Sequence, residues 1–135
     1  MNETNPPGGR DPAGAIGRNV EAFLLLELLR EPSYGYDLIR RLADYGFRRV
    51  PNEPATVYKL LRALEEGGAI ASTWSTEGSG PARRYYQITA PGIALLHERA
   101  GHLDRLRLRI ERFMARYAVL AGPGPGGVDG AGEAA

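Results

Sequence analysis

The chain has 135 residues, 43% of them hydrophobic and 24% charged, a size and composition that predict one compact domain. No apolar run approaches the ~20 residues of a membrane-spanning helix, and no basic and hydrophobic tract follows Met1. We therefore expect neither a membrane span nor a secretory signal. Cysteine is absent, which excludes disulfides, thiolate metal sites and cysteine nucleophiles and favours the cytoplasm.

The charge is unevenly distributed along the chain. The net charge is +1, but residues 18–118 alone carry 16 basic and 12 acidic side chains, and Lys59 is the only lysine. This mild excess is compatible with a polyanionic partner without requiring one. Glycine and proline are concentrated at the two ends, so we predict disordered tails at residues 1–17 and 121–135. A role of these tails as recognition arms is the alternative.

Three helices are predicted in the first half of the chain. Residues 19–30 are apolar on nearly all sides, which indicates a buried helix that ends at Glu31-Pro32. Ser33 is expected to cap a second helix that ends at Gly46. A third helix begins at Pro54 and ends at Gly67-Gly68. The residues of the second and third helices expected to face the core are Leu38, Ile39, Leu42, Val57, Leu60, Leu61 and Leu64.

After Gly68 the period of the apolar residues changes from about 3.6 to 2. Residues 69–75 and 83–89 are rich in β-branched and aromatic side chains, and a glycine-rich segment separates them, so a β-hairpin with a flexible tip is predicted. Thr89 then caps a final helix that begins near Pro91 and extends to about Ala118.

The final helix carries an apolar stripe with alternating spacings of three and four residues, which favours pairing with a second helix. A helix of roughly 27 residues spans ~40 Å, so we expect a second copy of the chain to cover its far end. The alternative is that the stripe packs only on its own domain. Gly101 is the expected position of a bend. The predicted dimerisation residues are Leu96, Leu103, Leu106, Ile110, Phe113 and Tyr117.

This order of elements predicts a mainly α fold with a β-hairpin. It is typical of a winged helix-turn-helix domain, here residues 18–90, followed by a long C-terminal dimerisation helix at residues 91–120. In that architecture the third helix lies in the DNA major groove, and the face opposite its core residues presents Ala55, Thr56, Lys59 and Arg62. These side chains suit base edges, thymine methyl groups and phosphates. A solvated helix face without a ligand is the alternative.

Further basic and aromatic residues are expected beside that face. Arg83 and Arg84 stand at the base of the hairpin, where phosphate contact is favoured, and Arg40 on the second helix adds positive charge. The hydroxyl of Tyr58 suits either a phosphate or a backbone carbonyl. The complete predicted DNA-binding set is Tyr34, Arg40, Ala55, Thr56, Tyr58, Lys59, Arg62, Arg83 and Arg84.

No catalytic or cofactor motif is present. His97 and His102 lie on different faces of one helix, and neither zinc-ligand spacing nor a phosphate-binding glycine loop with a following lysine occurs. We therefore expect no enzyme activity, no cofactor and no metal. The remaining rival is a winged helix that binds proteins rather than DNA, since fold alone does not determine function.

Three segments resemble the PadR family of bacterial transcriptional regulators. They are Tyr34-Gly35-Tyr36-Asp37-Leu38, residues 55–68 (ATVYKLLRALEEGG), and residues 84–92 (RYYQITAPG). The resemblance as a whole covers about residues 19–118, in the family's order and spacing. The single C-terminal helix is similar to the family's small subgroup.

The resemblance implies a homodimer that binds a palindromic operator in double-stranded DNA, usually as a repressor, in the cytoplasm and associated with the nucleoid. It places Tyr58 on phosphate and Thr56, Lys59 and Arg62 in the groove, although many members have proline at the position of Lys59. A small-molecule effector between the subunits and the absence of any effector are both compatible with the sequence. Some small members hold drugs between tryptophans of the dimer interface, but here the only tryptophan is Trp74 on the hairpin.

Overall fold

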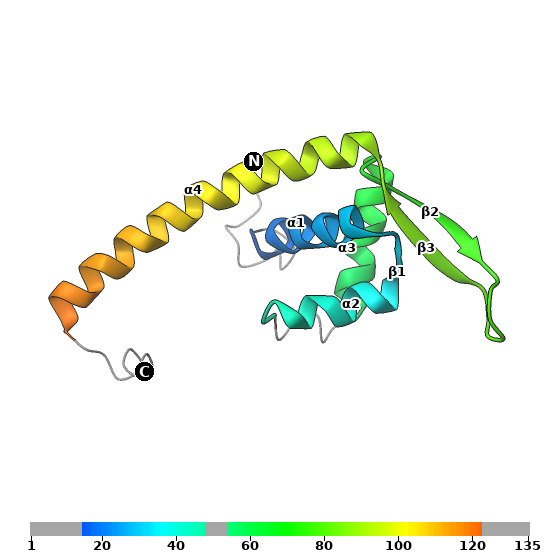
Figure 1. Ribbon diagram of the computed structural model, residues 1–135, viewed down its shortest axis with the longest axis horizontal. Coiled ribbons are helices and arrows are strands. Elements are labelled where there is room, and N and C mark those ends of the chain that lie inside the picture. Colours follow the sequence, from blue (N-terminus) through cyan, green and yellow to red (C-terminus); the bar gives the residue numbers. More distant parts are fainter. Residues whose placement is uncertain (1–14, 48–53, 123–135) are drawn as a thin grey trace, which may run out of the picture. The chain divides into compact units, whose positions relative to one another are not determined.

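The computed structural model describes residues 15–47 and 54–122 (Figure 1). They form two units, one ending at Ala100 and one beginning at Gly101, and the predicted tails lie largely outside the described residues. The fold is mainly helical with one small antiparallel sheet, as the sequence predicts. The elements in chain order are α1 (Ala15–Arg30), β1 (Ser33–Tyr34), α2 (Gly35–Asp44), α3 (Pro54–Glu66), β2 (Ile70–Ser75), β3 (Arg83–Ile88) and α4 (Ala90–Ala121).

Helix α1 is longer and less completely buried than expected. It begins at Ala15, ahead of the predicted start at residue 19 and inside the segment predicted to be a disordered tail. Leu24, Leu25 and Leu28 are buried, but Leu26 and Leu29 are 46% and 47% exposed. The predicted burial of this helix is therefore confirmed on one side and wrong for the side that carries Leu26 and Leu29. Within this unit the other elements cover one side of α1, and apolar composition alone does not reveal which sides are covered.

The predicted cap of α2 is also wrong. Tyr34, not Ser33, is the residue that precedes the helix, and it makes no side-chain capping bond. Ser33 instead belongs to strand β1 and is buried. Its hydroxyl donates to the Glu31 carbonyl at 3.2 Å and accepts from Arg41 Nη1 at 2.8 Å. Pairing of the backbone with β3 thus takes precedence over capping.

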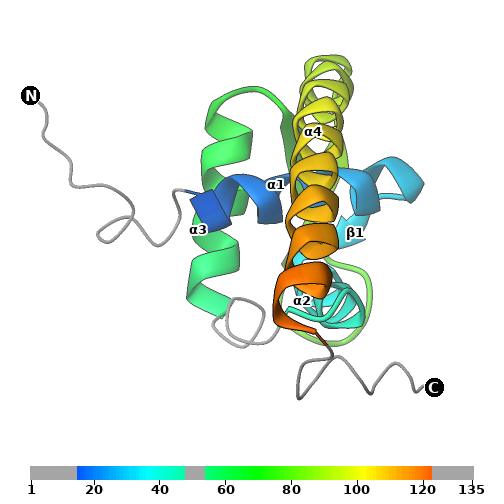
Figure 2. The same ribbon diagram turned by 90° about the vertical axis from the view of Figure 1, so that its left-hand side faces the viewer.

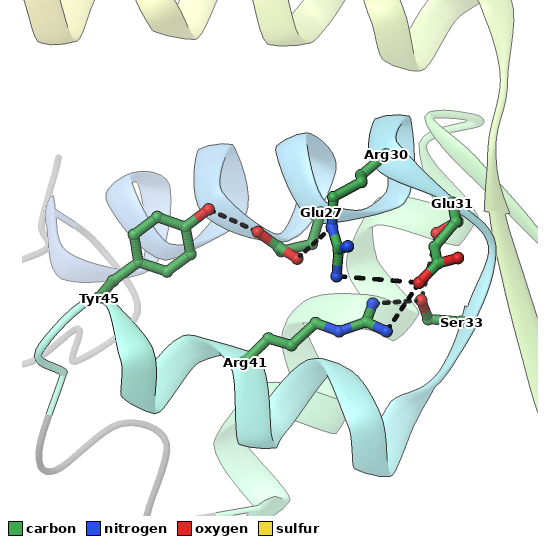
Figure 3. Close-up of polar contacts among 6 residues, drawn as sticks. All are labelled: Glu27, Arg30, Glu31, Ser33, Arg41 and Tyr45. Atoms are coloured by element: carbon green, nitrogen blue, oxygen red, sulfur yellow. Dashed lines mark hydrogen bonds and ion pairs between the residues drawn. The ribbon is translucent and has the colours of Figure 1, made fainter.

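A chain of polar contacts joins α1 to α2 (Figure 3). The Tyr45 hydroxyl donates to Glu27 Oε2 at 2.5 Å, and Arg30 Nε lies 3.4 Å from Glu27 Oε1. At the other end of the chain of contacts, Arg41 Nη2 of α2 lies 3.0 Å from Glu31 Oε2. Glu27 is only 9% exposed, so these partners offset the cost of desolvating its carboxylate. The adjacent carboxylate raises the pKa of Tyr45 to about 12, mainly by accepting its hydroxyl proton in a hydrogen bond.

The core forms where α1, α2 and α3 meet, and Figure 2 shows α1 crossing the middle of α3. The predicted inward residues of α2 and α3 are buried there, except Ile39, which is partly buried. Gly46 (φ 94°) follows α2 and Gly68 (φ 85°) follows α3. Both glycines adopt the left-handed backbone conformation that ends a helix at little cost, as predicted.

The sheet has three strands in the order β1-β3-β2. Strands β2 and β3 form the predicted hairpin, called the wing below, in which Trp74 lies opposite Arg84 and Ile70 opposite Ile88. Strand β1 was not predicted because two residues are too few to show a period of 2. It pairs Tyr34 with Tyr85, and so attaches the start of α2 to the wing.

The start of α4 is held against the end of α3. As predicted, the Thr89 hydroxyl caps the helix and accepts from the Gly92 amide at 3.1 Å. The Thr89 amide donates to the Ala69 carbonyl at 3.1 Å, and Leu96 is buried in the core. The helix continues through Gly101, the first residue of the second unit.

Candidate nucleic-acid interface

Helix α3 has one buried face and one exposed face. Its four leucine and valine core residues are at most 4% exposed, whereas Ala55, Lys59 and Arg62 are exposed and Thr56 is half-buried. Neither Lys59 nor Arg62 forms an ion pair with a carboxylate of residues 15–47 and 54–122. The four residues predicted to enter the major groove therefore share one side of the helix, with both cations available to a ligand.

A groove of about 420 Å³ runs between α3 and the wing. We call it the wing groove. Side chains of both elements line it, and they contribute three guanidinium groups and one carboxylate. They are Tyr58, Arg62 and Glu65 of α3 and Trp74, Arg83 and Arg84 of the wing. Guanidinium groups and tyrosine hydroxyls are common partners of nucleic-acid phosphates, so the excess of positive charge in this groove suits a phosphodiester.

Tyr58 is positioned by Gly35, the first residue of α2. A Cβ atom at Gly35 would lie 2.6 Å from Tyr58 Cε1 and 3.2 Å from its hydroxyl oxygen. Only glycine leaves room for the ring to lie against the helix start, with Tyr58 38% exposed at the edge of the wing groove. The sequence singled out Tyr58 but gave no sign of its dependence on Gly35.

Arg83 and Tyr34 form a second contact across the sheet. The Arg83 guanidinium lies 4.2 Å from the centre of the Tyr34 ring, which holds the cation through the ring quadrupole. Tyr34 also shares a hydrogen bond of 3.0 Å with Ser75 and packs on Tyr85 at 4.9 Å between ring centres. Arg83 therefore has a fixed support and leaves its hydrogen-bond donors available.

Arg84 is engaged within the protein, unlike Arg83. Its Nη1 lies 3.1 Å from Glu65 Oε1 and 2.7 Å from the Ser72 hydroxyl. Its guanidinium also lies 4.9 Å from the centre of the Trp74 ring. Sequence reasoning placed Arg84 on phosphate but missed Glu65, because the two residues are brought together only when α3 packs against the wing.

The remaining predicted residue of this set, Arg40, lies on α2 with its guanidinium 5.8 Å from the Tyr36 ring centre. Tyr36 is 61% exposed and also borders the wing groove. At the base of the groove Tyr86 is 5% exposed, and its burial raises the pKa of the hydroxyl. Tyr86 stays neutral and acts as a floor rather than as a charged ligand.

The predicted dimerisation residues lie along α4. Leu96 is buried in the first unit, and Leu103 and Leu106 are half-buried. Ile110, Phe113 and Tyr117 are 52%, 65% and 38% exposed. The far part of the helix therefore presents apolar side chains that no other described residue covers.

Across the part of the chain that the structure describes, no cluster of three or more histidine and acidic residues could hold a metal ion. Over those same residues, no helix is long and apolar enough to cross a membrane. The candidate site combines cations, hydroxyls and aromatic rings with the one carboxylate of Glu65, and side chains of these types are the ones that contact phosphates and base edges in protein–DNA complexes.

Comparison with known proteins identifies the family. The model of the PadR-like family of transcriptional regulators matches residues 24–98. This chain belongs to the PadR-like family. That stretch contains α2, α3 and the wing, so the family domain is the one that carries the site, and the protein is a DNA-binding transcriptional regulator rather than an enzyme.

Individual relatives are similar to this chain over most of its length and nearly all of their own. A PadR family transcriptional regulator from Eggerthella lenta is 32% identical, with a TM-score of 0.57 and 78% of this chain and 94% of that chain covered. A PadR-like transcriptional regulator from Bacillus cereus is 26% identical, with a TM-score of 0.64 and coverage of 73% and 94%. Uncharacterized protein X of Lysinibacillus sphaericus is 25% identical over 99 residues, which are 73% of this chain and 91% of that protein.

Proposed function

We propose that this PadR-like regulator binds an inverted-repeat operator as a homodimer and represses transcription. The observation that carries the proposal is the exposed face of α3, where Lys59 and Arg62 lack acidic partners among the described residues, next to Arg83 and Arg84 of the wing groove. A helix of this kind enters the major groove, while a wing contacts the neighbouring backbone.

The residues divide into two roles in this proposal. Thr56, Lys59 and Arg62 lie on the outer face of α3 and read base edges. Tyr58 and Arg83 lie at the wing groove, supported by Gly35 and Tyr34, and hold phosphates. Phosphate contacts fix the position of the protein on the duplex, whereas base contacts select the sequence.

The exposed apolar side chains of α4 support the homodimer. Ile110 and Phe113 are more than half exposed on a helix of 32 residues, and contiguous exposed apolar surface marks an association site. A two-fold pair of such helices, each supplying the same face, forms a self-complementary interface. Helix-turn-helix dimers bind half-sites about 34 Å apart, one turn of the duplex, and we propose the same spacing for the operator of this protein.

The test is a titration of the protein into fluorescently labelled DNA from upstream of its own gene, at two salt concentrations. We expect saturable binding that weakens with salt and that is lost in a duplex of equal length with scrambled half-sites. Lys59→Ala should reduce the difference in binding free energy between operator and scrambled duplex by about 1–3 kcal/mol. Tyr58→Phe should instead weaken binding to both duplexes. Equal affinity for operator and scrambled DNA would contradict sequence-specific regulation, and a protein–protein module would bind neither.

Repression of transcription and the two-fold symmetry of the operator are tested separately. Expression of a reporter from the same upstream DNA should rise when the protein is removed. Insertion of about half a helical turn between the half-sites should abolish tight binding, because it moves the second site to the opposite side of the duplex. A reporter that loses expression without the protein would indicate an activator.

A further inference from the structure

Two neighbouring arginines of the wing differ in how they are held. Arg83 rests on an aromatic ring and has no carboxylate partner among residues 15–47 and 54–122, whereas Arg84 is paired with Glu65. Both side chains line the wing groove. The two arginines are adjacent in the sequence, but in the structure only Arg83 has no acidic partner among the described residues, whereas Arg84 is already paired with Glu65.

The Glu65 carboxylate, which is paired with Arg84, makes the contacts that a phosphate would make. Glu65 Oε1 accepts from Arg84 Nη1 at 3.1 Å, and Glu65 Oε2 accepts from the Ser72 hydroxyl at 2.8 Å. The Ser72 hydroxyl in turn accepts from Arg84 at 2.7 Å. Two anionic oxygens thus engage a guanidinium and a hydroxyl, as the two non-bridging oxygens of a phosphodiester would.

The pair is exposed enough to exchange partners. The side chains of Arg84 and Glu65 are 42% and 32% exposed. Ion pairs at such sites are weak because water and salt screen them. Duplex DNA, with one negative charge for every ~1.7 Å of its axis, is a stronger competitor for a cation than one carboxylate.

We propose that Glu65 competes with DNA phosphate for Arg84 and thereby limits the affinity of the regulator for DNA. In the free protein Arg84 is paired with Glu65 and Ser72, and on DNA the guanidinium transfers to a phosphate. Each DNA-binding event therefore includes the cost of breaking one internal ion pair. The inference rests on the proposed DNA binding and assigns a role to Glu65, a residue that itself makes no contact with DNA in this scheme.

The test compares Glu65→Gln with Glu66→Gln. Glu66 is the next residue of α3, is exposed, and has no ion-pair partner among the described residues, so both changes remove the same charge from the same helix. Affinity for operator DNA is measured by fluorescence anisotropy over a series of salt concentrations. Removing a surface ion pair of this kind should tighten binding about two- to fivefold in Glu65→Gln, beyond any change in Glu66→Gln.

Two further variants separate the competition from a general effect of charge. Ser72→Ala removes one bond to each partner without changing any charge, and should tighten binding in the same direction but by less. The logarithm of the affinity falls linearly with the logarithm of the salt concentration. Arg84→Gln should make this slope shallower by about 0.9, the value for one phosphate contact. In the Arg84→Gln background, Glu65→Gln should have no more effect than Glu66→Gln.

Binding by Glu65→Gln that is no tighter than binding by Glu66→Gln, or an effect of Glu65→Gln that persists without Arg84, would overturn the competition. So would an unchanged salt slope in Arg84→Gln, because Arg84 would then make no phosphate contact. In each of these results the wild-type protein still binds the operator, so only the role of Glu65 fails. Failure of the wild-type protein to bind any duplex would instead overturn the proposed function. Circular dichroism melts of all variants establish that they are folded at the assay temperature.

Discussion

Gly92, in the first turn of α4, gives the sharpest test of how this fold is held together. A Cβ atom at this position would lie 2.0 Å from the Ala69 carbonyl oxygen and 2.8 Å from Ile88 Cγ1. The first of these neighbours is backbone, so no side-chain rotation relieves the clash. We therefore expect Gly92→Ala to force α4 away from the segment that follows α3.

The expected cost follows from three contributions. Overpacking costs about 1–3 kcal/mol. Moving the helix start also weakens the 3.1 Å bond from the Thr89 amide to the Ala69 carbonyl, worth about 0.5–1.5 kcal/mol. The higher helix propensity of alanine returns up to ~1 kcal/mol. With the full propensity gain subtracted, the free energy of unfolding should fall by about 0.5–3.5 kcal/mol, which lowers the urea midpoint by roughly 0.3–1.8 M at an m-value of about 2 kcal/mol/M.

Gly101 supplies a matched control in the same helix. A Cβ atom there would meet only Arg105 Nη1, at 3.7 Å, an ordinary contact with the end of a flexible side chain. Gly101→Ala should therefore raise the stability by up to ~1 kcal/mol through helix propensity alone. Urea unfolding followed by circular dichroism, at one fixed protein concentration because association affects stability, measures both variants. Shifts of the same sign and size would refute the argument from close packing.

Three other variants test separate parts of the molecule. Ile110→Asp should convert the proposed dimer to monomer in sedimentation equilibrium, since a charge on the exposed apolar face of α4 opposes pairing of two such helices; a variant as dimeric as the wild type would exclude this face. Tyr45→Phe should cost about 1–3 kcal/mol in urea unfolding, because Glu27 loses its 2.5 Å hydrogen bond. The raised pKa of Tyr45 means that the folded state favours the protonated hydroxyl, so its contribution is complete below pH 10 and is lost as the pH rises to about 12. The gap between wild type and Tyr45→Phe should therefore close over that range, and a constant gap would contradict the assignment. Gly35→Ala should displace the Tyr58 ring, which a Cβ atom would approach to 2.6 Å, and weaken DNA binding several-fold while the melting temperature changes little; unchanged binding would show that the ring position is not needed.

The helices and the hairpin were predictable because their signals are local. Glycines 46 and 68, the Thr89 cap and the change of period after Gly68 depend on neighbouring residues only, and the structure confirms them. One of the errors occurred where a distant segment competes. Ser33 was predicted as a cap, but β3 recruits its backbone into a sheet.

The candidate site divides in the same way. The outer face of α3 follows from helix periodicity, because four apolar core positions fix the direction of the rest. The fit of Tyr58 against Gly35 and the pairing of Arg84 with Glu65 could not be predicted, because neither pair is close in sequence and neither forms a motif.

The sequence by itself therefore determined the family, the order of the elements and the set of cationic and aromatic residues proposed to contact DNA, since each depends on residue type and short-range spacing. The tertiary structure alone decided which of those cations are available. Availability depends on which carboxylates and rings come within about 4–6 Å of a guanidinium, and these distances are set by the packing of α3 against the wing.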